Sequence, residues 1–311
     1  MKKFFEEHGG VAIILIVIAV LLVLVGSVKG LDEGTGKVNG SGIASIVGNA
    51  YFNAIDKFKD SFDNVLSGTG NSNNSNPTSG PNGESLVSTT ESQVGKYADI
   101  DGDGTVDGII FADLMVGGSG QFGNSDGAYS IPTISSSKNY YVSQESYTNV
   151  LGGTAEVLTS TGSGNDRFYI MALNDVSSNP VTWYASASFI PDWDSVTNYD
   201  FGKGKSNTNT MISKWNNKVY GDPNGASYTD MWDVIQTHVN NGWFVPSSKE
   251  WAAFNKQLGI TESNHEDKGL YSGYWSSSLY SYNQPVLVCS GSCLSNLGFR
   301  YKIPVRLAAT F

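Results

Sequence analysis

The most regular hydrophobic pattern in the chain is an unbroken apolar run near its start. Residues 11–28 read VAIILIVIAVLLVLVGSV, contain no charged side chain and are followed by Lys29. A helix of this length spans about 27 Å, close to the thickness of the hydrocarbon core of a bilayer. Because lipid cannot satisfy backbone hydrogen bonds, the run predicts a transmembrane helix in a membrane anchor at residues 1–30. Lys2 and Lys3 favour a cytoplasmic N-terminus, and a cleaved signal peptide is the main alternative.

A second pattern, over residues 41–66, has apolar positions three and four apart. Charged side chains such as Asp56, Lys57 and Asp60 lie between them. This spacing predicts an amphipathic helix within a stalk at residues 31–66. A membrane surface, a partner helix or a sister subunit would each cover its apolar stripe. The segment 41–66 is therefore a candidate for homo-oligomerisation.

Residues 67–93 carry almost no apolar side chains. The stretch SGTGNSNNSNPTSGPNGES is dominated by Gly, Ser, Asn and Pro, a composition that cannot bury a core and stays flexible. From residue 94 onward, short apolar and aromatic runs return, broken by Gly, Asn, Ser and Asp. The pattern predicts a flexible linker at 67–93 and one globular domain at 94–311.

Two helices and several short strands are expected in this domain. Apolar residues recur at helical spacing over 229–240 and 247–258, and Ser247 followed by Glu250 makes a capping box at the start of the second helix. The other apolar runs are short and separated by turn residues, as in small antiparallel sheets with many loops. The expected fold class is therefore α+β.

Composition narrows the class of partner. The chain has 311 residues, a net charge of −10 and only 15% charged residues. Its hydrophobic fraction of 40% is enough to bury a core. The acidic balance argues against nucleic acid as a partner, since phosphate binding needs a basic surface. Low charge with many small polar and aromatic residues is typical of an extracellular protein.

An acidic loop follows the start of the domain. Asp99, Asp101, Asp103 and Asp107 stand at positions 1, 3, 5 and 9 of a calcium-loop pattern, with glycine at position 6. Position 12, where such loops carry a glutamate, is Ile110. A hairpin turn built from Asp-Gly pairs explains the same residues. Structural calcium and a plain turn both remain open.

The only two cysteines, Cys289 and Cys293, lie close together in the sequence Cys-Ser-Gly-Ser-Cys. They can form one tight disulfide in an oxidising compartment, or remain two free thiols on a loop. No histidine or further cysteine lies nearby in the sequence, so zinc ligation is not expected.

Three segments near the C-terminus form a recognisable frame. They read GWFVPSSKEW at 242–251, YWSSS at 274–278 and KIPVRLAATF at 302–311. Through them the chain resembles bacterial proteins with a C-type-lectin-like fold, in particular the variable proteins of diversity-generating retroelements. These are related to Lcl C-terminal-type and formylglycine-generating-enzyme-like domains. The resemblance implies a C-type-lectin-like domain at 94–311, preceded by the transmembrane and amphipathic helices.

The resemblance also implies a ligand-binding face between Ser278 and Lys302, which adenine-directed mutagenesis would vary. Tyrosine supplies large contact area at low entropic cost, and serine and asparagine adapt their hydrogen bonds to many partners. The candidate ligand-binding residues are Tyr280, Tyr282, Asn283, Ser290, Ser292, Ser295, Asn296, Phe299 and Tyr301.

These patterns predict a surface-displayed adhesin or receptor that recognises an extracellular protein or glycan. It would be a single-pass protein of the cell membrane, with its C-terminal domain outside. No catalytic residues are identified, because His8, His238 and His265 lie in no recognisable arrangement with a nucleophile. The alternatives are a pilus-like or structural assembly subunit and a thiol-dependent enzyme of the sulfatase-modifying type that would use Cys289 and Cys293.

Overall fold

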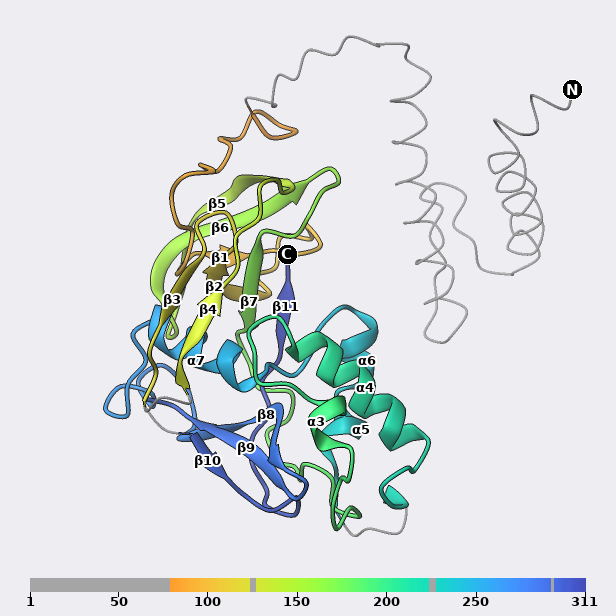
Figure 1. Ribbon diagram of the computed structural model, residues 1–311. Helices are drawn as coiled ribbons and strands as arrows, with labels where there is room; N and C mark the ends of the chain where they lie inside the picture. Colours follow the sequence, from red (N-terminus) through yellow and green to blue (C-terminus); the bar gives the residue numbers. More distant parts are fainter. Residues whose placement is uncertain (1–78, 124–126, 224–227, 292–293) are drawn as a thin grey trace, which may run out of the picture. The chain divides into compact units, whose positions relative to one another are not determined.

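The computed structural model describes residues 79–123, 127–223, 228–291 and 294–311, which belong to one compact unit, Asn76–Phe311 (Figure 1). The transmembrane helix predicted at 11–28 and the amphipathic helix predicted at 41–66 lie outside the described residues. Within the described ranges, no helix is both long and apolar enough to cross a bilayer.

The predicted fold class is wrong. We expected a C-type-lectin-like domain of two helices and small antiparallel sheets, preceded by a transmembrane helix. The described residues contain more strand than helix. They form a six-stranded sheet and, separately, five helices, and no membrane-spanning helix is found among them. The prediction failed because many of the strands and helices are too short to leave a periodic signal in the sequence.

The main sheet is formed by β1 (Tyr97–Ala98), β2 (Gly108–Asp113), β5 (Asn139–Asn149), β6 (Gly153–Thr161), β7 (Phe168–Ala172) and β11 (Ala308–Thr310). Their order in the sheet is β11-β7-β2-β1-β6-β5 (Figure 1). Neighbours run antiparallel except β1 and β6, which are parallel. Strands β1 and β2 are buried along their whole length, so the middle of this sheet forms part of the core.

Two smaller antiparallel sheets accompany it, one of β3 (Gly118–Gly120) and β4 (Tyr129–Ile131), the other of β8 (Gly273–Ser281), β9 (Gln284–Cys289) and β10 (Leu294–Asn296). The order in the second is β10-β9-β8. This sheet lies at the end of the unit away from β5 and β6 (Figure 1). Its strands contain three of the residues that were predicted to bind a ligand, Tyr280, Ser295 and Asn296.

The helices are α3 (Trp193–Val196), α4 (Gly204–Asn216), α5 (Met231–Val234), α6 (Gln236–Asn240) and α7 (Ser248–Gln257). The capping box at the start of α7 is confirmed: Ser247 Oγ accepts from the Glu250 N–H, and Glu250 Oε2 accepts from the Ser247 N–H. The helix predicted at 229–240 is broken at Ile235 into the short helices α5 and α6. Helix α4 was not predicted, because its sequence GKSNTNTMISKWN is largely polar.

Three buried tryptophans fix β8 to the rest of the unit through their indole N–H groups. Trp183 donates to the Ser276 carbonyl at 2.9 Å, and Trp275 donates to the Val181 carbonyl at 2.9 Å. Trp251 of α7 donates to the carbonyl of Trp275 at 3.2 Å. A buried indole needs such a partner, so these bonds and the ring packing together hold β8 in place.

Residues 79–93, the described part of the predicted linker, lie against the domain. The Arg167 guanidinium donates to the carbonyls of Ser88 and Glu91, at 2.8 and 3.1 Å. It also donates to both carboxylate oxygens of Asp113, each at 2.8 Å, and both side chains of this ion pair are only 1% exposed. The globular unit therefore begins before residue 94, and this part of the linker prediction is corrected.

Candidate ligand-binding site

The residues predicted to bind a ligand differ in their exposure to solvent. Ser295 is half-buried, and Ser292 lies outside the described residues. Five are exposed: Tyr280, Tyr282, Asn283, Asn296 and Tyr301.

Two of the predicted residues are buried and do not contact solvent as a binding residue must. Phe299 is 5% exposed and stacks on Trp183, with ring centroids 5.6 Å apart. Ser290 is 4% exposed and donates to the carbonyl of Tyr271 at 2.6 Å. Both were chosen from their place in a loop-like sequence, which carries no information on the direction of a side chain. Their prediction as ligand contacts is therefore corrected.

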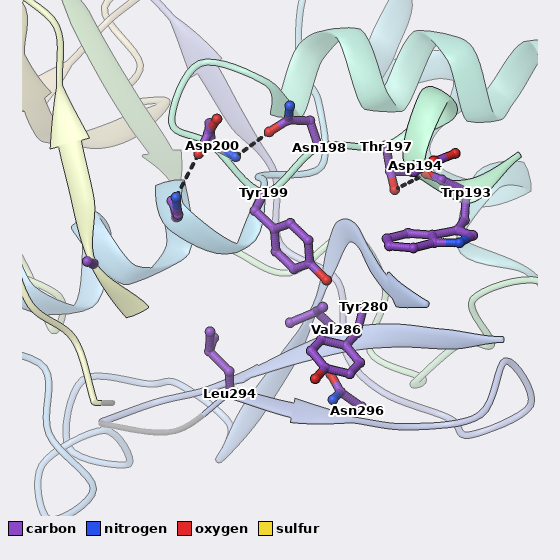
Figure 2. A pocket seen from close by; sticks show the side chains of 12 residues that line it. Trp193, Asp194, Thr197, Asn198, Tyr199, Asp200, Tyr280, Val286, Leu294 and Asn296 are labelled. Atoms are coloured by element: carbon purple, nitrogen blue, oxygen red, sulfur yellow. Dashed lines mark hydrogen bonds and ion pairs between the residues drawn. The ribbon is translucent and has the colours of Figure 1, made fainter. Parts of the chain in front are cut away.

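A cavity of about 600 Å³ opens between the β8–β10 sheet and the chain around α3 (Figure 2). Tyr280 and Asn296, two of the predicted residues, line it together. Its size is within the range of small-molecule pockets. The remaining lining residues, none of them predicted, are Ala128, Trp193, Asp194, Thr197, Asn198, Tyr199, Asp200, Lys249, Val286 and Leu294.

One wall of the cavity is the chain that leads from α3 to α4. Thr197 Oγ1 accepts from the Leu279 N–H at 3.2 Å, and Ser278 Oγ donates to the Asn198 carbonyl at 3.1 Å. These two bonds tie the wall to β8. Tyr199 follows directly and points across the cavity in Figure 2. Its direction is thus set by contacts between segments about 80 residues apart in the chain.

The opposite wall is the small sheet. Successive side chains of a strand face opposite sides, so Val286 of β9 lines this cavity while Leu287 lines a second cavity behind the sheet. In β10, Leu294 and Asn296 face the first cavity. Ser295 lies opposite Leu287 in the β9–β10 register and so belongs to the other face. The predicted residues are therefore divided between two surfaces.

The charges at the cavity are partly compensated. Lys249 Nζ lies 2.7 Å from Asp200 Oδ1. Asp200 stands at one end of the cavity (Figure 2). Asp194 adds an exposed carboxylate. Tyr199 and Tyr280 contribute hydroxyl groups, which both donate and accept. The cavity is therefore aromatic and polar, with a small negative charge.

Glu250 joins the two helices next to this site. Its Oε1 accepts from the backbone N–H groups of Gly202 and Gly204, at 2.9 and 3.2 Å, and its Oε2 accepts from Ser247 at 2.7 Å. Complete burial raises the pKa of the Glu250 carboxyl to about 7, although these hydrogen bonds act to lower it. The carboxyl thus holds the start of α4 against the start of α7.

The acidic loop connects β1 and β2. Oxygens of Asp99, Asp101 and Asp107 lie within 4.8 Å of one another, whereas Asp103 is not part of this cluster. Asp99 accepts from two backbone N–H groups of the turn at 2.8 and 3.0 Å, and Asp103 accepts from the Thr105 N–H at 2.7 Å. Burial raises the pKa of Asp107, and the neighbouring carboxylates raise it further. The cluster offers oxygen ligands that suit calcium, and the same carboxylates also close the hairpin turn.

Cys289 is disulfide-bonded, and Cys293, the other cysteine of the chain, lies outside the described residues. Cys289 and His265 line the second cavity, of about 570 Å³. His265 Nδ1 lies 2.9 Å from the Leu270 carbonyl. His238 lines a third, smaller cavity. The two histidines therefore belong to different surfaces. Neither lines the first cavity, which we call the aromatic cavity after its lining residues Trp193, Tyr199 and Tyr280.

The chain matches no family model, no curated protein and no solved structure. The missed residues Trp193 and Tyr199 do carry a signal in the sequence. Two aromatics stand in the polar stretch PDWDSVTNYD at 191–200, as exposed contact residues often do. Their meeting with Tyr280 depends on tertiary contacts, which the sequence pattern does not contain.

Proposed function

We propose that this chain is a recognition protein that binds its ligand in the aromatic cavity. The observation that carries the proposal is the meeting of Tyr280 and Asn296 with Trp193 and Tyr199 around one cavity. These four side chains come from two distant parts of the sequence. Aromatic rings give large contact area at low entropic cost, and they stand on a framework fixed by buried tryptophan side chains.

Binding explains this site better than catalysis. The two described histidines, His238 and His265, lie at other cavities. The Lys249 ammonium group is held in an ion pair with Asp200, so it does not serve as a general base. The cavity provides a shaped surface with hydroxyl, amide and carboxylate groups. Such groups orient a ligand and make its binding specific.

An oxidising compartment is part of the proposal. Disulfides persist outside the reducing cytosol, and Cys289 is disulfide-bonded. The low fraction of charged residues, 15%, fits the same location. The ligand would accordingly be an extracellular protein or glycan.

The proposal is tested with the full chain on arrays of purified glycans and purified proteins. Tyr280→Ala removes an aromatic ring from the cavity, and we expect it to weaken every ligand retained by the wild type by about tenfold or more. Tyr271→Ala is the matched control, because Tyr271 and Tyr280 are 51% and 52% exposed and Tyr271 lines the second cavity instead. Ligands that survive Tyr280→Ala but not Tyr271→Ala would place the site elsewhere and refute the proposal.

A further inference from the structure

The aromatic cavity has the form of a slot. Trp193 and Tyr199 extend from one wall, and Tyr280 stands on the other (Figure 2). The Tyr199 hydroxyl points across the slot toward Val286 and Tyr280. A ring-shaped ligand in this space would present one face to each wall.

The charges select against an anionic ligand. Lys249 is the only cation among the described residues that line the slot, and it is held 2.7 Å from Asp200. Asp194 leaves an exposed carboxylate, and the whole chain carries a net charge of −10. A carboxylate on a ligand would therefore be repelled by Asp194, and Lys249, the one cation among the described lining residues, is already paired with Asp200.

The polar groups select for a ligand that both donates and accepts hydrogen bonds. The Asn296 amide carries two donors and an acceptor, and the hydroxyls of Tyr199 and Tyr280 do both. The aromatic faces are electron-rich and attract polarised C–H groups. A ligand that matches all of these has flat C–H faces and a rim of hydroxyls.

We infer that the slot holds one ring of a neutral glycan, ending in a hexose or an N-acetylhexosamine. The C–H faces of the sugar pack between Tyr280 and the rings of Trp193 and Tyr199, and its hydroxyls meet Asn296 and Asp194. This inference rests on the proposed function and adds the class of ligand to it. The alternative ligand is a protein, and the test must distinguish it from a neutral glycan.

The probe is an array of defined oligosaccharides with neutral ends, matched with the same oligosaccharides capped by sialic acid. The full chain is applied as wild type, Tyr280→Ala, Tyr280→Phe and Tyr271→Ala. We expect neutral ends to be retained and their sialylated counterparts to bind about tenfold more weakly or not at all. Tyr280→Ala weakens retention by about tenfold or more. Tyr280→Phe keeps the ring and most of the binding, and Tyr271→Ala behaves as wild type.

Intrinsic fluorescence gives a second readout with a soluble glycan taken from the array. Trp193 is the only tryptophan among the described residues of the cavity lining, so binding changes the emission of the wild type and not that of Trp193→Phe. Equal binding of sialylated glycans, or glycan binding indifferent to Tyr280→Ala, overturns the inference. A blank glycan array together with a protein ligand lost in Tyr280→Ala overturns the glycan class and leaves the proposed function standing.

Discussion

At the scale of single residues, Glu250 shows how one buried group organises the framework of the site. Its carboxyl accepts three backbone N–H bonds from two separate segments and is fully buried. The sequence predicted one of its roles, since Ser247 and Glu250 stand at capping-box spacing. It could not predict the bonds to Gly202 and Gly204, because they join residues 46 and 48 positions apart in the chain.

The raised pKa of Glu250 has a defined effect on stability. Burial lifts it from 4.5 to about 7, so the folded chain binds this proton more tightly than the unfolded chain. The contribution is complete below about pH 4.5 and is lost as the pH rises through 7. Its full size is on the order of 3 kcal/mol for a shift of this magnitude.

Glu250→Gln tests this effect. The amide cannot titrate, and its NH₂ group would face the Ser247 N–H, so we expect the variant to be destabilised by about 1–3 kcal/mol at pH 5. The difference from wild type should shrink between pH 5 and pH 8, because only the wild type has the Glu250 contribution that is lost as the pH rises. Urea unfolding at each pH measures it, with the exposed Glu266→Gln as control. A difference that stays constant or widens would show that the carboxyl is ionised throughout.

At the scale of elements, the sheet of β8, β9 and β10 explains which parts of the site were predictable. The resemblance and the residue types led us to expect a ligand-binding face here, and two of the expected residues, Tyr280 and Asn296, line the cavity. The alternation of the strands was not visible, because β10 has only 3 residues. Ser290 and Phe299 lie outside these strands, so no alternation pattern could show that their side chains are buried.

The same sheet predicts which positions tolerate substitution. Saturation mutagenesis should find Tyr280, Tyr282 and Asn296 nearly neutral for folding, within about 0.5 kcal/mol, because they are exposed. Phe299→Ala should cost about 3–5 kcal/mol, since it empties a site stacked on Trp183. The resistance of each variant to proteolysis measures the fraction of unfolded protein and hence the free energy of unfolding. If sibling chains vary as the resemblance implies, their differences should follow the same division, and frequent variation at Phe299 would contradict it.

At the scale of the whole unit, the proposed binding cavity and the first described residues lie at different ends. Residues 85–87 bond to β5, since the Val87 N–H donates to the Tyr140 carbonyl and the Val142 N–H donates to the Ser85 carbonyl. The β8–β10 sheet lies at the end of the unit away from β5 (Figure 1). Among the described residues, the first along the chain to line the cavity is Ala128. Recognition should thus be a property of the unit itself, with residues 79–93 contributing to its stability through Arg167.

Two truncations separate these contributions. We expect residues 76–311 to melt like the full chain and to retain its array ligands, because this stretch is one compact unit and contains every described residue that lines the cavity. Residues 94–311, the domain predicted from the sequence, lose the Ser88 and Glu91 carbonyls that accept from Arg167. A buried guanidinium deprived of acceptors costs roughly 2–3 kcal/mol, or a fall in Tm of roughly 5–10 °C for a unit of this size. Thermal unfolding followed by circular dichroism measures the Tm of both fragments. Equal Tm values would mean that residues 79–93 contact the unit without stabilising it.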